Sequence, residues 1–322
     1  MNKPLEPTST AAAADVEVFF GELTDSIARI YLRAGQLPEG VERIAGRVRG
    51  PRCEFARTLP SEAKFEAGSD DGPWLASATL PDPCPWTPEL PMIYDVTWEL
   101  LDGRGEAVAT ARRELGLRPL GARGTSLYLD GRRWVPRGAR ADSVEADGVV
   151  GGGRASEVPD VDTWREGHAV MLVDRPDDEL AAVASRRGVL LMATVGGDSA
   201  GTPLTESALR EELRRLAHWP AVAMVALASD AAVDDDLRRS VPNLLLAQLA
   251  AGEPAVKVES WADLVLCSGS AAEVVATKLD REVPLVALAP QRTFADVDAA
   301  RSACDTWQGE LAAHGDFAGY LV

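Results

Sequence analysis

The stretch 218-HWPAVAMVALASD-230 predicts a β-strand that is buried on both faces. Every residue from Ala221 to Ala228 is Ala, Val, Met or Leu, and Ser229 and Asp230 follow directly. A continuous apolar run is typical of a parallel strand covered on both sides, whereas a strand with one solvated face alternates apolar and polar residues. The run therefore predicts a central parallel strand whose carboxyl end presents an acid.

Seven further short apolar runs lie in the same part of the chain, and helical patterns separate most of them. The runs are RRWVPRGAR (132–140), HAVMLVD (168–174), GVLLMATVGG (188–197), PAVKVES (254–260), ADLVLCSGS (262–270), VPLVALAP (283–290) and FAGYLV (317–322). Eight strands that alternate with helices predict a compact (β/α)8 TIM barrel, which we place at residues 123–322.

Two segments carry the clearest helical pattern. Residues 205–219 put Leu209, Leu213 and Leu216 on one face, and Thr205 is in position to cap the helix. Apolar residues from 297 to 311 recur at steps of three and four. The glycine-rich stretch 144–160 is predicted to be the loop after the first barrel strand.

Residues 1–122 have a different periodicity. Segments such as DVEVFF (15–20), SIARIYLR (26–33) and YDVTWELLD (94–102) alternate apolar and polar residues, and turns such as PEG and DGRGE separate them. Alternation at period two with short spacing predicts an antiparallel β-sandwich.

Charge and composition limit the classes of partner and cofactor. With 50 acidic and 33 basic residues the net charge is -17, which disfavours nucleic acid as a partner. No apolar run has the length of a signal peptide or a membrane span, so we expect a cytoplasmic protein that binds no membrane. The four cysteines have no CxxC spacing and are expected to be buried, and the three histidines are not paired at metal spacing. We therefore expect neither a metal nor an organic cofactor.

Residues 84–140, at the junction of the two halves, resemble glycoside hydrolase family 2, which contains β-galactosidases, β-mannosidases and β-glucuronidases. The matching residues are Trp86, Thr87, Pro88, Pro91, Ile93, Tyr94, Gly116, Leu117, Arg118, Leu129, Asp130, Gly131, Arg137 and Gly138, with Pro220, Val222, Met224 and Leu227 in the fourth strand. The resemblance extends over roughly residues 75–322. It implies that the sandwich is immunoglobulin-like and that the barrel follows it.

The resemblance also implies a place for each catalytic group. Family members are retaining glycosidases, in which two carboxylates stand about 5–5.5 Å apart. The acid/base glutamate of an Asn-Glu pair follows the fourth strand, where this chain has Ser229 and Asp230. The nucleophilic glutamate follows the seventh strand, where this chain has Ala289, and Ala141 replaces a histidine after the first strand. Because alanine carries no nucleophile, the resemblance predicts a glycosidase scaffold that has lost hydrolysis.

Other acids at predicted strand ends keep an alternative open. Asp142, Asp174 and Glu259 are expected to follow strands one, two and five, on the same face as Asp230. Asp230 could therefore pair with Glu259 or Asp174 in an atypical hydrolase. The same acids could instead cap helices or pair with arginines such as Arg140.

Three functions thus remain open from the sequence. The first is a degenerate glycosidase that binds carbohydrate or a protein partner, with Ser229, Asp142 and Arg140 as candidate binding residues and Trp261 as the aromatic that would stack on a sugar. The second is a working hydrolase that uses Asp230. The third is a structural or assembly protein with a filled barrel, either as a homo-oligomer or with another protein.

Overall fold

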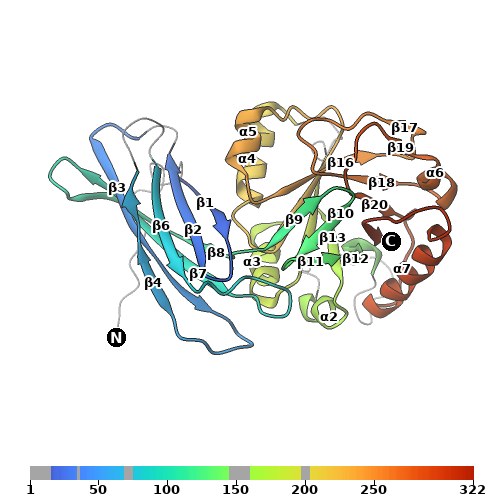
Figure 1. Ribbon diagram of the computed structural model, residues 1–322, viewed down its shortest axis with the longest axis horizontal. Helices are drawn as coiled ribbons and strands as arrows, with labels where there is room; N and C mark the ends of the chain where they lie inside the picture. Colours follow the sequence, from blue (N-terminus) through green and yellow to red (C-terminus); the bar gives the residue numbers. More distant parts are fainter. Residues whose placement is uncertain (1–15, 35–36, 69–74, 145–159, 197–203) are drawn as a thin grey trace. The chain divides into compact units, whose positions relative to one another are not determined.

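The computed structural model describes residues 16–34, 37–68, 75–144, 160–196 and 204–322 (Figure 1). The chain forms two compact units, one of Met1–Trp86 with Leu90–Leu117 and one of Thr87–Glu89 with Arg118–Val322. The predicted glycine-rich loop at 144–160 lies almost entirely outside the described residues. Within the described ranges, no helix has both the length and the apolar character needed to cross a membrane.

The first unit is an antiparallel sandwich of two four-stranded sheets, as the alternating pattern predicts. One sheet has the order β1 (Val16–Leu23), β2 (Ile27–Ala34), β6 (Leu75–Pro81), β5 (Glu66–Ala67), and the other has the order β4 (Ser61–Lys64), β3 (Val41–Arg52), β7 (Ile93–Asp102), β8 (Ala107–Leu115). Alternate residues of β2 are buried, which is the burial pattern of a strand with one solvated face.

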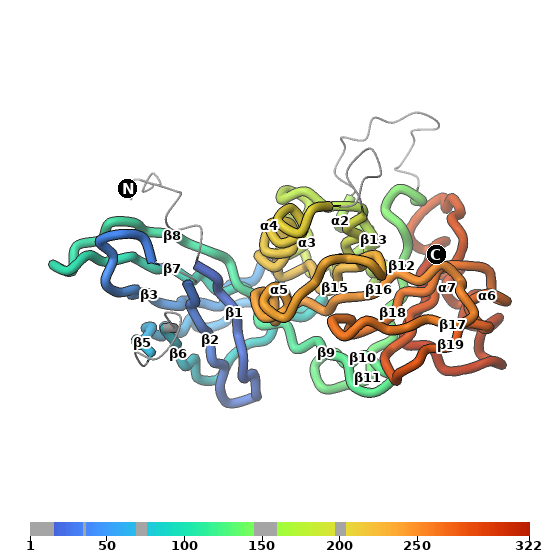
Figure 2. The backbone as a smooth tube through the Cα atoms, turned by 90° about the horizontal axis from the view of Figure 1, so that it is seen from above, coloured from blue at the N-terminus to red at the C-terminus, as the bar shows by residue number. Residues whose placement is uncertain are grey.

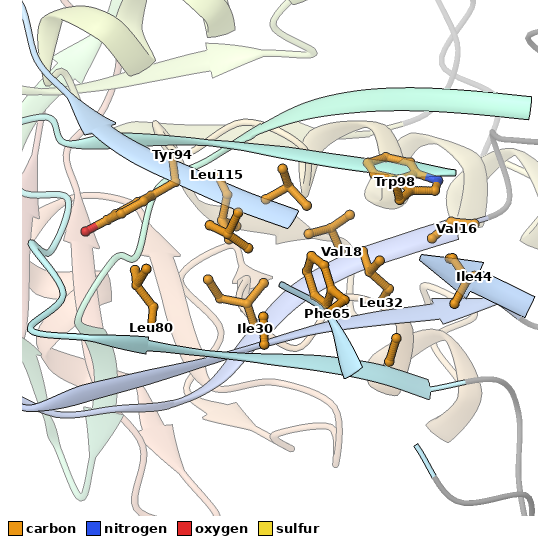
Figure 3. Close-up of a cluster of buried hydrophobic side chains, with 14 of the residues drawn as sticks. Val16, Val18, Ile30, Leu32, Ile44, Phe65, Leu80, Tyr94, Trp98 and Leu115 are labelled. Carbon is orange, nitrogen blue, oxygen red and sulfur yellow. The ribbon is translucent and has the colours of Figure 1, made fainter. Parts of the chain in front are cut away.

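The core of the sandwich lies between its two sheets. Figure 3 shows Ile30, Leu32 and Leu80 of one sheet pointing into the same interior as Tyr94 and Trp98 of the other. All five side chains are at most 4% exposed. Burial of large apolar side chains at about 25 cal/mol per Å² is the main stabilising contribution to such a unit.

The second unit is a closed barrel of eight strands, as predicted. Around the ring the strands are β12 (Arg137–Arg140), β13 (Val170–Asp174), β14 (Leu191–Val195), β15 (Val222–Leu227), β16 (Leu245–Ala250), β18 (Leu264–Ser268), β20 (Leu285–Leu288) and β21 (Gly319–Leu321). Every neighbouring pair is parallel, and β21 pairs with β12 to close the ring. All six residues of β15 are buried, in agreement with the apolar run that predicts it.

Short helices follow most of the barrel strands. They are α2 (Val161–Glu166), α3 (Asp178–Arg187), α4 (Glu206–Leu216), α5 (Asp235–Ser240), α6 (Ala271–Ala276) and α7 (Val297–Leu311), with a 3-10 turn η1 (Ala141–Ser143) after β12. The predicted apolar face of α4 is buried, and Thr205 Oγ1 accepts a hydrogen bond from the Ala208 N–H at 3.3 Å. The predicted apolar face of α7 is buried as well.

The predicted position of the fifth barrel strand is wrong. The strand is β16, whereas the apolar run at 254–260 contributes only β17 (Ala255–Val256), which pairs with β19 (Lys278–Leu279) in a separate two-stranded sheet (Figure 2). β16 is rich in Leu and Ala, which favour helices, and contains Gln248, so its sequence does not look like a buried strand. The buried Gln248 amide donates to Lys257 O at 2.9 Å and accepts from Glu259 N–H at 2.8 Å. These bonds compensate for burying a polar side chain.

Arg118 is anchored at the amino end of the barrel. The residue is 6% exposed, and its guanidinium donates to Pro220 O and, at 2.6 Å, to Asn243 O. Pro220 and Asn243 lie just before β15 and β16, so the Arg118 side chain connects the amino ends of two neighbouring strands. After Arg118 the chain forms a three-stranded sheet of β9 (Leu120–Arg123), β10 (Ser126–Leu129) and β11 (Arg132–Trp134) before it enters β12.

The four cysteines are free thiols. Cys267 and Cys304 are buried as predicted, whereas Cys53 and Cys84 are partly exposed because they lie in loops of the sandwich. The Cys304 thiol donates to Gly138 O at 3.2 Å.

Candidate active site

The carboxyl ends of all eight barrel strands meet at one rim, because every neighbouring pair is parallel. Active sites of such barrels are built at this end from residues that follow the strands. The described residues that end the strands are Arg140, Asp174, Val195, Leu227, Ala250, Ser268, Leu288 and Leu321.

Asp174 ends β13 as predicted and is held in place by the neighbouring strand. It is in register with Thr194 of β14, whose hydroxyl donates to Asp174 Oδ1 at 3.0 Å. The next residue, Arg175, has a positive φ of 45° and donates its N–H to Thr194 O at 3.1 Å. The chain therefore turns sharply after β13 and leaves the Asp174 carboxylate exposed on the rim.

Ser229 and Asp230 follow β15 at the same rim, as predicted. Both are exposed, and they lie in a turn closed by the Ala231 N–H, which donates to Ala228 O at 3.1 Å. Only β14 separates the strands that carry Asp174 and Asp230. Because adjacent strands are about 4.8 Å apart, β13 and β15 are separated by roughly 10 Å across β14.

Ala289 follows β20, at the position where the resemblance places a nucleophile. Its N–H donates to Leu321 O at 2.8 Å, so its backbone still belongs to the barrel wall. The residue is 5% exposed, and it lines a cavity of about 110 Å³ together with Trp307 of α7 and Val322. The residue at the position where the resemblance would place the nucleophile is therefore a buried alanine.

Arg140 and Asp142 lie where the first strand ends, as predicted. Arg140 is half-buried and Asp142 is exposed in η1. Ser143 Oγ donates to Arg140 O at 2.7 Å, and the Phe294 N–H donates to Ser143 O at 2.7 Å. The segment after Ala289 thus crosses to the first strand and forms part of the rim next to Arg140.

Glu259 and Trp261 do not lie at the rim, so the prediction that they follow strand five is wrong. Both come after β17, on the segment that leads into the amino end of β18. Arg281, which precedes β20, donates to Glu259 O at 2.7 Å, and Trp261 is buried at 8% exposure. The error follows directly from the misplaced fifth strand. The strand assignment therefore no longer supports a pair formed by Asp230 and Glu259.

Two features of the rim are not predicted from the sequence. One is the hydrogen bond between Thr194 and Asp174. Thr194 is the single polar residue within the run 189–195, and this could have marked it as a residue with a polar partner. The other is the return of the segment 290–294 to η1, for which the sequence has no signal. Among the described residues, no three His, Cys, Asp or Glu side chains are grouped as metal ligands.

No family model and no curated protein matches the chain, but solved glycosidase structures share its fold. A glycosyl hydrolase family 2 member from Bacteroides cellulosilyticus has a TM-score of 0.61 at 13% identity, covering 95% of this chain and 43% of that one. A β-glucuronidase from Ruminococcus gnavus, solved with an N1-substituted uronic isofagomine, has a TM-score of 0.59 at 13% identity over 95% and 60% of the two chains.

The β-D-glucuronidase of Dictyoglomus thermophilum is also similar, with a TM-score of 0.57 at 14% identity over 95% of this chain and 61% of that one. The chain thus spans less than two thirds of the length of these structures. At such identities the likeness concerns the fold alone: the chain shares the fold of the parts of these structures that it covers.

Proposed function

We propose that this chain binds carbohydrate at the carboxyl rim of its barrel and does not hydrolyse it by the retaining two-carboxylate mechanism. The observation that carries the proposal is Ala289, a buried methyl group after β20 where the family resemblance calls for the nucleophile. Without a lone pair at this position, no covalent glycosyl-enzyme intermediate forms there.

The acid/base position supports the same conclusion. Asp230 is one methylene shorter than glutamate, and displacement of a reacting group by about 1 Å costs on the order of a hundredfold in rate. Groups of a catalytic set act as a unit, so removal of one of them costs on the order of 10⁴ or more in turnover. Both changes together leave a scaffold without the two-carboxylate chemistry that the family resemblance implies.

The rim nevertheless offers groups that suit a sugar. Carboxylates such as Asp174 and Asp230 accept hydrogen bonds from hydroxyl groups, and Ser229 can both donate and accept. Arg140 adds a guanidinium, which would suit an acidic sugar. These side chains come from three different strand ends, which is how barrels of this kind assemble a binding site.

A hydrolysis assay combined with calorimetry tests the proposal. Incubation with 4-nitrophenyl β-glucuronide, β-galactoside and β-mannoside should release no nitrophenol above the uncatalysed rate. Titration with glucuronic acid, galactose and mannose should show saturable binding of at least one sugar. Asp230→Asn should weaken that binding, whereas the matched control Asp25→Asn, an exposed aspartate in a loop of the sandwich, should leave it unchanged.

Two outcomes would overturn the proposal. Turnover that Asp230→Ala abolishes would make the chain a hydrolase. Inversion of the anomeric centre in that turnover would favour a widely spaced carboxylate pair, such as Asp230 with Asp174, since inverting enzymes separate their carboxyl groups by about 6.5–9.5 Å. Failure of every sugar to bind would leave interaction with a protein, or a purely structural role, as the function of the barrel.

A further inference from the structure

A second cavity lies at the opposite end of the barrel from the rim. Its volume is about 310 Å³, and its lining includes Val135, Ala169 and Leu190, which come just before β12, β13 and β14. Because the strands are parallel, residues that precede them lie at the amino end of the barrel. The cavity is therefore separate from the candidate carbohydrate site. Its size is at the lower end of the range for small-molecule sites, about 300–1,000 Å³.

The cavity is cationic in a strongly acidic chain. Three arginines line it, Arg137, Arg165 and Arg301, against a single carboxylate, Glu89, and His168 lies among them. The whole chain has 50 acidic and 33 basic residues, so the balance of charge in the lining is the reverse of that in the chain. Such a local excess of cationic side chains favours an anionic ligand.

The three arginines come from separate elements and differ in how far they are already paired with other protein groups. Arg137 of β12 is paired with Asp305, its Nε lying 3.1 Å from Oδ1, and also donates to Gln308. Arg165 of α2 donates to Glu89 O over a long 3.5 Å. Arg301 of α7 forms no ion pair with the described residues, so its charge is the most available to a ligand.

Aromatic and aliphatic side chains form the rest of the lining. Trp134 is half-buried and Trp164 is 2% exposed, and Leu129 and Val135 add apolar surface. Indole rings present flat faces to planar groups, and arginine binds carboxylate and phosphate oxygens in a bidentate manner. The combination suits a molecule that has an anionic head and a planar apolar body.

The backbone at His168 is a further sign that the side chains here have a role. His168 has a positive φ of 48°, a conformation that favours glycine, and its N–H donates to Arg165 O at 3.0 Å. Residues other than glycine that are held in this region cost of order 1 kcal/mol or more and are concentrated at functional sites. A histidine at this turn thus keeps an imidazole at the edge of the cavity at some cost in stability.

We propose that this cavity binds a small organic anion, in which a carboxylate or phosphate is attached to a planar apolar body. Arg301 and Arg165 face the anionic head, and the tryptophans contact the body. The site is independent of the carbohydrate site at the rim.

Calorimetric titration of the full chain tests the proposal with phenyl phosphate, benzoate and the neutral analogue benzyl alcohol. At least one anion should bind saturably and about tenfold or more tighter than the alcohol, since a charge-assisted bond contributes that much. Phenyl phosphate binding alone would identify a phosphate site, and benzoate binding alone a carboxylate site. Binding should quench tryptophan fluorescence, because two tryptophans line the cavity.

Variants connect the binding to the cavity. Arg301→Gln should weaken the anion about tenfold, and Arg301→Lys, which keeps the charge, should restore part of the affinity. The matched control Arg292→Gln changes an exposed arginine after β20 and should have no effect. If neither anion binds saturably, or if Arg301→Gln binds like the unmodified chain, the proposal is wrong. Asp230→Asn should not affect this binding, which separates the test from that of the rim.

Discussion

Substitution of Arg118 by methionine measures how much one buried guanidinium contributes to the stability of the barrel. The side chain donates to Pro220 O and Asn243 O, just before β15 and β16. Each charge-assisted bond contributes about 1.5–3 kcal/mol, so the two together contribute about 3–6 kcal/mol. Burial lowers the pKa of Arg118 to about 10 through loss of solvation, and this desolvation offsets part of the gain.

We therefore expect Arg118→Met to lower the free energy of unfolding by about 3 kcal/mol, since methionine fills the space but leaves two carbonyls unpaired. For a unit of this size that corresponds to a fall in Tm of about 6–12 °C. The free energy of unfolding of Arg118→Lys should lie between those of the unmodified chain and Arg118→Met, because an ammonium group lacks the planar fork with which the guanidinium reaches both carbonyls.

Differential scanning calorimetry of the full chain provides the measurement. Arg123→Met, at an exposed arginine of β9, is the control and should change stability by no more than about 0.5 kcal/mol. If Arg118→Met behaved like this control, the carbonyls would be satisfied in another way and the reasoning would be refuted.

Three further predictions concern the barrel unit. In a urea titration, Gly138→Ala should prevent ring closure or lower the free energy of unfolding by at least about 3 kcal/mol, because an added Cβ would lie 1.8 Å from a backbone oxygen of β13. The control Gly121→Ala should be tolerated, because its added Cβ would meet no atom within 4 Å. Burial raises the pKa of the Cys304 thiol to about 11, so the folded chain holds this proton where the unfolded chain has lost it. The contribution of this thiol to the free energy of unfolding should therefore be fully present below about pH 9 and should be lost between about pH 9 and 11. Unfolding curves collected across this range should show a less steep loss of stability for Cys304→Ser. Thr194→Val removes the hydroxyl that holds Asp174, so calorimetry should show weaker sugar binding at the rim at an almost unchanged Tm; an unchanged affinity would exclude Asp174 from the site.

The barrel could be predicted because most of its strands are continuous apolar runs with a helical pattern between them. The ends of these runs placed Asp174, Asp230 and Ala289 on one rim, where the structure has them. Strand ends are predictable when a buried run stops abruptly at a polar residue or a proline, as it does at each of these three positions.

The fifth strand could not be found in this way. Gln248 interrupts its apolar pattern, and the bonds that make the residue acceptable come from the backbone of Lys257 and Glu259, about ten residues further along the chain. Such compensation by tertiary contacts has no signature in local sequence. Glu259 and Trp261 were misplaced for the same reason, since their predicted positions depended on the wrong strand.

The position of β21 in the ring has a consequence for synthesis of the protein. Residues 319–321 pair with both β12 and β20, so these two strands keep unpaired edges until the last part of the barrel has left the ribosome. Unpaired strand edges promote aggregation of nascent chains. Val144 and Phe294 form a parallel bridge that joins the segments after β12 and β20 without any contribution from β21. This bridge can hold the two edges near each other while the gap for the final strand is still open.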